Sequence, residues 1–493
     1  MSFSIKKQAS YLFIGKIVSF IIRFGIPIYL VRVFTKEEYG IYRQLLLIGG
    51  FFVPILQMSM ASSLFFFTPQ IKDKINQLYA QTFYFLILAG LLVFPILYFF
   101  RDGLIMLFKN DKFYNYSFLC ASYSFFTMIA IMFENILILE KRNRRMFAYV
   151  IGCDILRVIL IISAIYIYGT FESVFIAQIL LQTIIASSLF IYLIKKYSIF
   201  KIQNWDKSIF WKQIRYSFPL GLGGISTTIG KRANGFIINA YLSASSYAVF
   251  TIGAFKIPLV GEFYASIART TRPQFASYWK EGKNKKSIKL WHKQISIFFC
   301  VTFPLVLFFF IMAHDIITLL YTDKYAESVN IFRILIMLIL FQSSSWGTIP
   351  KAYNATNYVF KANTVSMIIG VIIGLVLISN FGLYGAAISA VLTFFIEVIL
   401  LLVKSKSLLN LKVSKWLPWK NLFRILIINT IISIPLFFFL HLEFHKLLKL
   451  MIAGSLFFLP LVFLYQKLNI LDILELMRNI FKRGKLKPDT INL

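Results

Sequence analysis

The stretch FIGKIVSFIIRFGIPIYLVR, residues 13–32, has the length and the apolar content of a helix that crosses a lipid bilayer. A helix rises about 1.5 Å per residue, so about 20 apolar residues span a hydrocarbon core of about 30 Å. The same stretch carries Lys16, Arg23 and Arg32. It therefore predicts a membrane protein and raises the question of why positive charges stand where lipid is expected.

Similar apolar runs recur along the whole chain, which has 493 residues of which 59% are hydrophobic. This composition lies outside the range of soluble globular proteins. We expect an all-α integral membrane protein with about 14 transmembrane helices, near residues 10–33, 45–67, 79–100, 116–139, 148–168, 174–194, 218–241, 248–268, 294–313, 329–349, 362–380, 385–403, 422–440 and 447–465.

The net charge of +32 is placed as membrane topology requires. Most Lys and Arg residues lie in short gaps between apolar runs and not on a folded polar surface, so nucleic acid is not an expected partner. With the N-terminus inside, the predicted inner segments hold 35 Lys and Arg residues and the outer loops hold 7. This positive-inside bias predicts a multi-pass protein with both termini in the cytoplasm. The basic start lacks a small-residue cleavage site, so we expect a retained first helix.

A weak internal repeat divides the predicted helices. A shift of 208 residues places residues 29–42 within the segment 236–250, aligning Tyr39 with Tyr247 and Arg23 with Lys231. Six helices per repeat preserve orientation, so the halves are expected to be parallel repeats. The expected organisation is an N-terminal six-helix lobe (1–194), a cytoplasmic inter-lobe linker (195–217), a C-terminal six-helix lobe (218–403), extra helices 13 and 14 (404–465) and a basic cytoplasmic tail (466–493).

Several cations lie well inside the predicted spans, where each costs about 2.5–3.5 kcal/mol to insert. Arg157 has a neighbour of opposite charge, Asp154, three residues earlier on the same helix face, which predicts a local ion pair. The other cations face few acids, so the interior is predicted to be net positive and to hold an anion in a water-accessible cavity between the two halves. These cations are Lys16, Arg23, Lys231, Arg232 and Lys256.

No part of the sequence indicates an enzyme. The longest connections run to about 23 residues, too short for an independent catalytic domain. The segment HLEFH, residues 441–445, spaces two histidines as metal ligands, but its Glu stands in the wrong place for a zinc protease, and no metal is expected. We expect no cofactor, and coupling to H⁺ or Na⁺ stays open, with Asp154 and Glu262 as candidate coupling residues.

The segment FTKEEYGIYRQLLLIGGF, residues 34–51, follows a first helix that carries internal cations. Glu38, Tyr39 and Gly40 match a Glu-Tyr-Gly turn, while Thr35-Lys36 replaces the Gly-Pro that usually precedes it. With this turn, the length and the paired lobes, the chain resembles the polysaccharide (O-antigen and capsule repeat-unit) flippases of the multidrug/oligosaccharidyl-lipid/polysaccharide exporter superfamily.

That resemblance implies a V-shaped bundle of two lobes in the bacterial inner membrane. It also implies a cationic lumen that takes the pyrophosphate and sugars of an undecaprenyl-linked oligosaccharide and moves it to the outer leaflet by alternating access. By position, Arg23 and Lys231 fall where family members place cavity cations, and Lys16, Arg232 and Lys256 transfer less directly. The implied partners are the lipid-linked oligosaccharide, membrane lipids, a polysaccharide polymerase and a chain-length regulator.

Two other functions stay open at this point. A cation-coupled multidrug exporter of the same superfamily would need acidic cavity residues, for which Asp154 and Glu262 are available, although buried Lys and Arg exceed them. A membrane polysaccharide polymerase or ligase would be expected to carry a large outer loop with catalytic residues. The predicted outer loops are short and poor in His and Arg.

Overall fold

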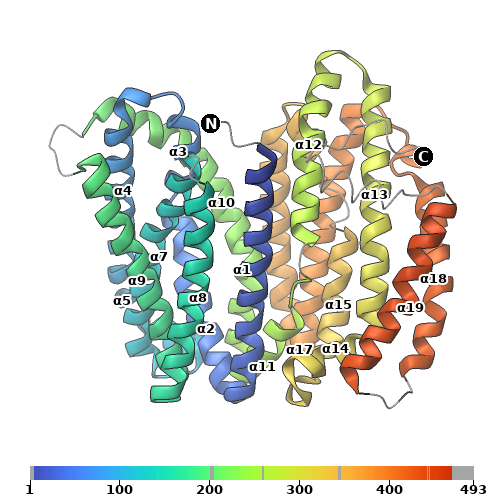
Figure 1. Ribbon diagram of the computed structural model, residues 1–493, viewed down its shortest axis with the longest axis horizontal. Coiled ribbons are helices and arrows are strands. Elements are labelled where there is room, and N and C mark those ends of the chain that lie inside the picture. Colours follow the sequence, from blue (N-terminus) through green and yellow to red (C-terminus); the bar gives the residue numbers. More distant parts are fainter. Residues whose placement is uncertain are drawn as a thin grey trace. The chain divides into compact units, whose positions relative to one another are not determined.

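The computed structural model describes residues 5–140, 143–199, 205–257, 260–341, 346–440, 442 and 445–468, and the side chains within them apart from those of 5–17, 72, 143–144, 262, 265–266, 269–270 and 413. The elements found there are helical, and Figure 1 labels those for which there is room. They are α1 (Ile5–Val33), α2 (Lys36–Leu56), α3 (Met60–Phe67), η1 (Lys72–Lys74), α4 (Ile75–Leu91), α5 (Val93–Phe99), α6 (Arg101–Phe108), α7 (Phe113–Leu139), α8 (Asn143–Tyr168), α9 (Phe171–Tyr197), α10 (Lys207–Tyr241), α11 (Ala244–Gly253), α12 (Val260–Lys280), α13 (Asn284–Ile311), α14 (Ala313–Tyr321), η3 (Asp323–Tyr325), α15 (Ser328–Phe341), α16 (Thr348–Ala352), α17 (Thr356–Leu409), η4 (Val413–Lys415), α18 (Trp419–Leu440) and α19 (Lys446–Lys467).

The prediction of an all-helical membrane protein is confirmed, whereas the helices divide differently from the predicted spans. Among the described residues, nine helical segments are long and apolar enough to cross a membrane. The predicted span 45–67 is broken after α2, where Met58 and Ser59 have positive φ. The predicted span 248–268 is broken between α11 and α12. Residues 254–257 of this second break are non-helical.

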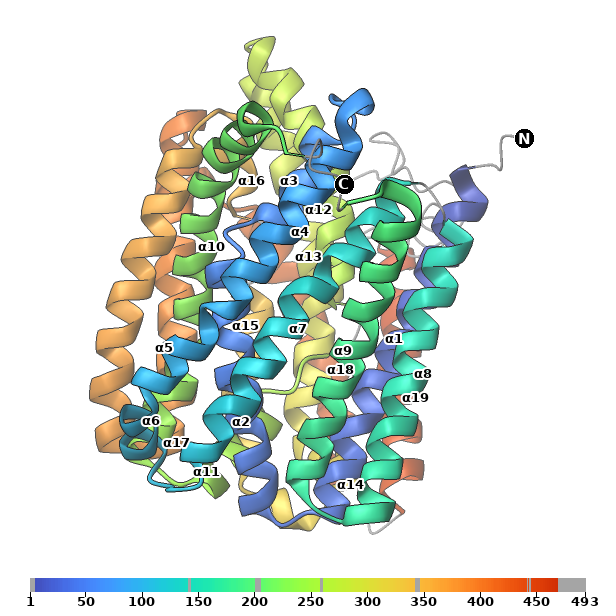
Figure 2. The same ribbon diagram turned by 90° about the vertical axis from the view of Figure 1, so that its left-hand side faces the viewer.

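The chain forms two compact units, Met1–Ala248 and Val249–Leu493. In the first unit, α7 packs against α2, α4 and α9, and α8 packs against α1 and α9 (Figure 2). Together with α3, their apolar faces enclose a core that includes Leu64, Leu86, Met132 and Leu189, all fully buried. Residues 207–217, which we expected in the inter-lobe linker, form the first turns of α10 and pack in this unit.

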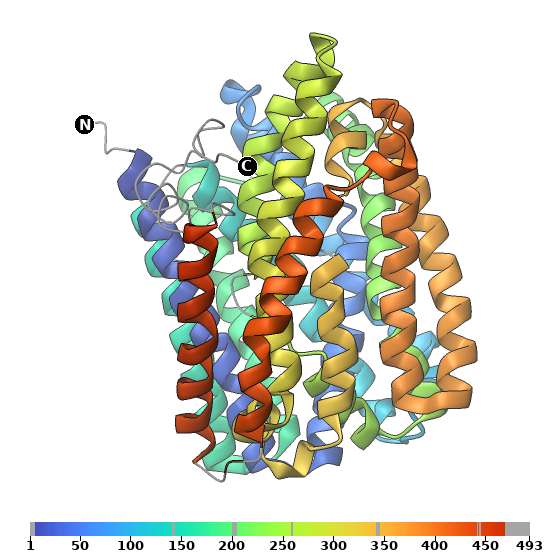
Figure 3. The ribbon, with the colours of Figure 1, turned by 90° about the vertical axis from the view of Figure 1, so that its right-hand side faces the viewer.

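In the second unit, α13 packs against α12, α15 and α18, and α17 packs against α15 and α16 (Figure 3). The helical run α17 contains a reversal at Gly382, where φ is 57° and ψ is −131°. Glycine fits this backbone because it has no side chain to clash. A Cβ on Gly370 would lie 2.4 Å from Oγ1 of Thr393, so the two halves of α17 pack closely as a helical hairpin.

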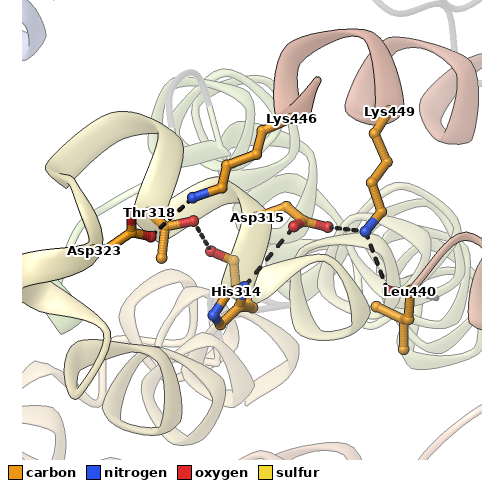
Figure 4. A network of polar contacts seen from close by, with 7 residues as sticks. All are labelled: His314, Asp315, Thr318, Asp323, Leu440, Lys446 and Lys449. Atoms are coloured by element: carbon orange, nitrogen blue, oxygen red, sulfur yellow. Dashed lines mark hydrogen bonds and ion pairs between the residues drawn. The ribbon is translucent and has the colours of Figure 1, made fainter. Parts of the chain in front are cut away.

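An ion pair holds α19, the last helix that the structure describes, to the body of the second unit. Nζ of Lys449 on α19 lies 3.0 Å from Oδ2 of Asp315 on α14 and donates to the carbonyl of Leu440, and both charged side chains are almost fully buried. Nearby, Lys446 pairs with Asp323 at the surface at 2.8 Å (Figure 4). Because buried charges need partners, the first pair ties α19 to α14.

The Glu-Tyr-Gly turn has a structural reason at each of its residues. Thr35 caps α2 by accepting the backbone N–H of Glu38, and the Glu38 carboxylate accepts the N–H of Thr35 at 2.9 Å, which is a capping box. Tyr39 is buried and hydrogen-bonded to Arg43. A Cβ on Gly40 would lie 2.0 Å from the carbonyl oxygen of Ala244, so glycine lets α2 contact the start of α11.

Candidate functional site

Two arginines of the first unit share one carboxylate. Nε of Arg23 on α1 donates to Oδ1 of Asp154 on α8 at 2.8 Å. Arg157, one turn further along α8, binds the same oxygen at 2.5 Å. The predicted local pair between Asp154 and Arg157 is therefore confirmed. Arg23, which we counted among the cations that face few acids, shares the same carboxylate. Sequence spacing shows neighbours on one helix but cannot show that α1 packs against α8.

Burial within this triad is uneven. The Asp154 side chain is fully buried, that of Arg157 is 17% exposed and that of Arg23 is 56% exposed. Oδ2 of Asp154 is also buried and has no hydrogen-bond partner in the described part of the chain. The triad of Arg23, Asp154 and Arg157 thus carries one net positive charge. It offers an accessible guanidinium on Arg23 and, in Oδ2 of Asp154, an acceptor oxygen without a hydrogen-bond partner among the described residues.

Arg232 on α10 lies against α2. Its Nη1 donates to the carbonyl of Leu47 at 2.8 Å. A Cβ on Gly50 would lie 2.8 Å from Nη2 of the same guanidinium, so the absence of a side chain at Gly50 makes room for it. Arg232 is half-buried, and its contacts are made to backbone and aromatic groups of α2 and its neighbours.

Arg43 on α2 is a second half-buried arginine here, and sequence reasoning missed it. It lay in a predicted outer loop, because the second span was expected to begin at residue 45, whereas α2 begins at Lys36. Arg43 hydrogen-bonds Tyr39 and interacts electrostatically with Tyr42, Tyr247 and Arg232. The signal that was available is the capping box at Thr35, which marks an earlier helix start and moves Arg43 into the helix.

The triad and the second pair of arginines are linked through α7. The hydroxyl of Tyr123 interacts electrostatically with both Arg157 and Arg232. We call the set Arg23, Arg43, Arg157 and Arg232 the arginine cluster. With Asp154, its charged groups sum to three positive charges, and counting the exposed Glu134, which interacts with the neighbouring Tyr149, still leaves two. Guanidinium groups suit a multiply charged anion with several acceptor oxygens.

The positions of the other predicted site residues say less about function. Lys231 is exposed on α10, one residue before Arg232. Lys256 is exposed in the non-helical segment between α11 and α12, and so is not inside a helix as predicted. The structure does not describe the side chains of Lys16 and Glu262. It also does not describe His441 and Glu443 of the HLEFH segment.

A family model described as "Polysaccharide biosynthesis protein" matches residues 29–330, more than half of the chain. The chain belongs to this family of polysaccharide biosynthesis proteins. The match includes Arg43, Asp154, Arg157 and Arg232 and begins shortly after Arg23. The chain is also 22% identical over 412 residues to the capsular polysaccharide biosynthesis protein CapF of Staphylococcus aureus, covering 80% of this chain and 97% of that one.

This chain shares its fold with solved structures of membrane transporters. The lipid II flippase MurJ, in an inward closed conformation, matches with a TM-score of 0.69 and 16% identity over 94% of this chain and 99% of that one. An inward-facing multidrug-resistance MATE transporter of the MOP superfamily matches with a TM-score of 0.58 and 15% identity over 83% and 97%. The resemblance to polysaccharide flippases of this superfamily is thereby confirmed, and the family member has the fold of a membrane transporter.

Proposed function

We propose that this protein is a flippase that moves undecaprenyl-pyrophosphate-linked oligosaccharide repeat units from the cytoplasmic leaflet to the outer leaflet by alternating access. The observation that carries the proposal is the arginine cluster, which presents the half-exposed guanidinium of Arg23 from a membrane helix. Arg pairs with phosphate through two parallel N–H···O bonds, so a pyrophosphate fits such a cluster better than a neutral or cationic solute does.

The named relatives support a lipid-linked sugar as the substrate class. One takes part in capsular polysaccharide biosynthesis, and the structural relative with a TM-score of 0.69 is a flippase for lipid II. Outward movement of a pyrophosphate also runs with the membrane potential, which contributes about 2.3 kcal/mol per charge per 100 mV when the inside is negative. We therefore expect the potential to assist the charged step.

Within this proposal, Arg23, Lys231 and Arg232 bind the pyrophosphate in a cationic cavity, and Lys16 and Lys256 contribute to the same field. We add Arg43 to this set, because it interacts with Arg232 and is half-buried on α2. The orientation that we propose places both termini in the cytoplasm, in line with the bias of Lys and Arg toward the predicted inner segments. A polysaccharide polymerase and a chain-length regulator are proposed partners.

Ion coupling is proposed at Asp154. Its Oδ1 is held by Arg23 and Arg157, whereas its buried Oδ2 has no partner among the described residues. A proton on Oδ2 would neutralise the carboxylate and weaken its hold on Arg23, which would free that guanidinium for substrate. Proton binding and substrate binding would then be linked through one residue.

The drug-exporter alternative is less well supported by the same geometry. A cationic drug needs an accessible carboxylate, and Asp154 is fully buried and already bound to two arginines. Its environment favours an anionic ligand. The described part of the site therefore favours the flippase.

A reconstitution experiment tests the proposal. The purified protein is placed in vesicles with a fluorescent undecaprenyl-pyrophosphate oligosaccharide, and the share of substrate in the outer leaflet is followed by a membrane-impermeant quencher. We expect wild-type protein to move substrate across, and Arg23→Gln and Arg232→Gln to slow this movement at least tenfold, since each loses a charge-assisted bond worth about 1.5–3 kcal/mol.

Arg215→Gln is the matched control for Arg232→Gln. It removes one guanidinium from the same helix, α10, at an exposed position. We expect Arg215→Gln to translocate like wild type. Normal translocation by both cluster variants would contradict the assignment of the site, and transport of a cationic drug with no movement of the lipid-linked sugar would contradict the proposed function.

A further inference from the structure

The second unit contains a basic cavity to which no residue of the arginine cluster contributes. It has a volume of about 530 Å³ and lies where the start of α13 meets the loop between α17 and α18. Three lysines line it: Lys285 from α13, Lys415 from η4 and Lys420 from α18. A cavity of this size is within the range of about 300–1,000 Å³ that small-molecule sites occupy.

Few acids stand near this cavity in the sequence. Glu281, four residues before Lys285, pairs with Lys283. Residues 282–314 and 398–442, which contain every residue that lines the cavity, include no Asp or Glu. The three lysines are exposed, and none of them forms an ion pair with the residues that the structure describes. The cavity also contains the first turn of α18, where the helix dipole attracts negative charge.

The cavity is built on an anchored loop. The ring Nε2 of His292 on α13 hydrogen-bonds with the carbonyl of Lys415 at 3.0 Å. Leu411, at the start of the loop, is buried. Lys406 on α17 stacks over the ring of Trp416 at 5.6 Å, which fixes the loop from its other side. The backbone that bears the lysines is therefore fixed, which lowers the entropic cost of ordering it when a ligand binds.

An exposed apolar surface leads away from the cavity along one side of α18. Trp419 lines the cavity and is 45% exposed, and the large apolar side chains that follow it at helical spacing are exposed as well: Phe423, Ile427, Ile431, Ile434 and Phe438. With 22 residues, α18 is about as long as the hydrocarbon core is thick, so its first turn lies at a membrane boundary. Tryptophan is enriched at that depth.

From these observations we infer that the cavity of Lys285, Lys415 and Lys420 binds the phosphate headgroup of an anionic phospholipid, whose acyl chain lies along the apolar side of α18. The proposed orientation places this end of α18 at the cytoplasmic leaflet. Basic pockets between membrane helices on that side are suited to anionic headgroups. The apolar surface distinguishes this ligand from free phosphate, because a soluble anion would use the lysines alone.

Native mass spectrometry of the delipidated full-length protein tests this inference. The protein is titrated with phosphatidylglycerol and, separately, with phosphatidylcholine of the same acyl chains. We expect wild type to bind one phosphatidylglycerol in preference to phosphatidylcholine. In the triple variant Lys285→Gln/Lys415→Gln/Lys420→Gln this preference should fall about a hundredfold, since each lysine contributes about fivefold. The substituted residues are exposed, so the variant should keep the wild-type melting temperature.

A second triple variant controls for net charge. Lys195→Gln/Lys207→Gln/Lys212→Gln removes three exposed lysines from α9 and α10 of the first unit, none of which lines the cavity. It should retain the wild-type preference. Equal loss in the two triple variants would show only general membrane electrostatics and would overturn the site, as would retained preference in the cavity variant. Displacement of phosphatidylglycerol by millimolar inorganic phosphate would overturn the assignment of a lipid.

Discussion

Gly40 on α2 stands directly against the backbone of Ala244, whose carbonyl oxygen lies 2.0 Å from where a Cβ on Gly40 would be. The two residues belong to the two segments that the 208-residue shift aligns, 29–42 and 236–250. Each segment is a helix, a short break and a second helix. Ser243 caps the second by accepting the N–H of Ser246, much as Thr35 caps α2. This contact places Tyr39 and Tyr247 beside Arg43.

We expect Gly40→Ala to lower the free energy of unfolding by about 1–3 kcal/mol. The added methyl group would clash with backbone, which cannot rotate away as a side chain can, and this cost exceeds the gain of about 1 kcal/mol in helix propensity. SDS titration in mixed micelles, read by circular dichroism, measures the change. Gly103→Ala on α6 is the control, because nothing lies within 4 Å of its Cβ position. Equal stability of the two variants would contradict the close contact.

Asp154→Asn and Arg23→Gln should differ in stability although they break the same contact. Asn at 154 leaves the guanidinium of Arg157, only 17% exposed, without its counter-charge. Breaking a buried pair in this way costs about 3–5 kcal/mol. Arg23→Gln leaves Arg157 and Asp154 paired and removes a half-exposed partner, so about 0–1 kcal/mol is expected. Thermal unfolding in detergent compares them, and a larger loss in Arg23→Gln would refute this division of roles.

The sequence was sufficient to predict the membrane class, the helical content and the family, because apolar runs and the turn at Glu38-Tyr39-Gly40 are local signals. It also predicted the pair of Asp154 and Arg157, whose spacing is local. The contact of Arg23 with Asp154 spans 131 residues and depends on how α1 packs against α8. Hydropathy also predicted the start of α2 too late, because a polar first turn lowers the apolar average even where a capping box begins the helix. Arg43 was therefore assigned to a loop and not to the helix.

Lys449→Met should destabilise the second unit more than Lys446→Met, three residues earlier on α19. The Lys449 and Asp315 side chains are both almost fully buried, so removing the lysine leaves a buried carboxylate and costs about 3–5 kcal/mol. Lys446 pairs with Asp323, which is 80% exposed, and such surface pairs contribute about 0–1 kcal/mol. Adding Asp315→Leu to Lys449→Met should restore much of the loss. Melting temperatures of the three variants measure this, and a double variant as unstable as the single one would contradict the ion-pair explanation.

The pH dependence of stability should reveal the titration of Glu140, the residue at the C-terminal end of α7. Burial alone would raise the pKa of its carboxyl, but hydrogen bonds from Lys196, Tyr192 and Tyr197 outweigh it and hold the pKa below the ordinary value of 4.5. A carboxyl whose pKa is lower in the folded state adds stability above its unfolded pKa and loses it as pH falls through the folded value. We expect the melting temperature of wild type to fall below about pH 4.5. Glu140→Gln should melt lower than wild type at pH 7 and lose less on acidification, so a parallel fall in both proteins would show that Glu140 does not carry the effect.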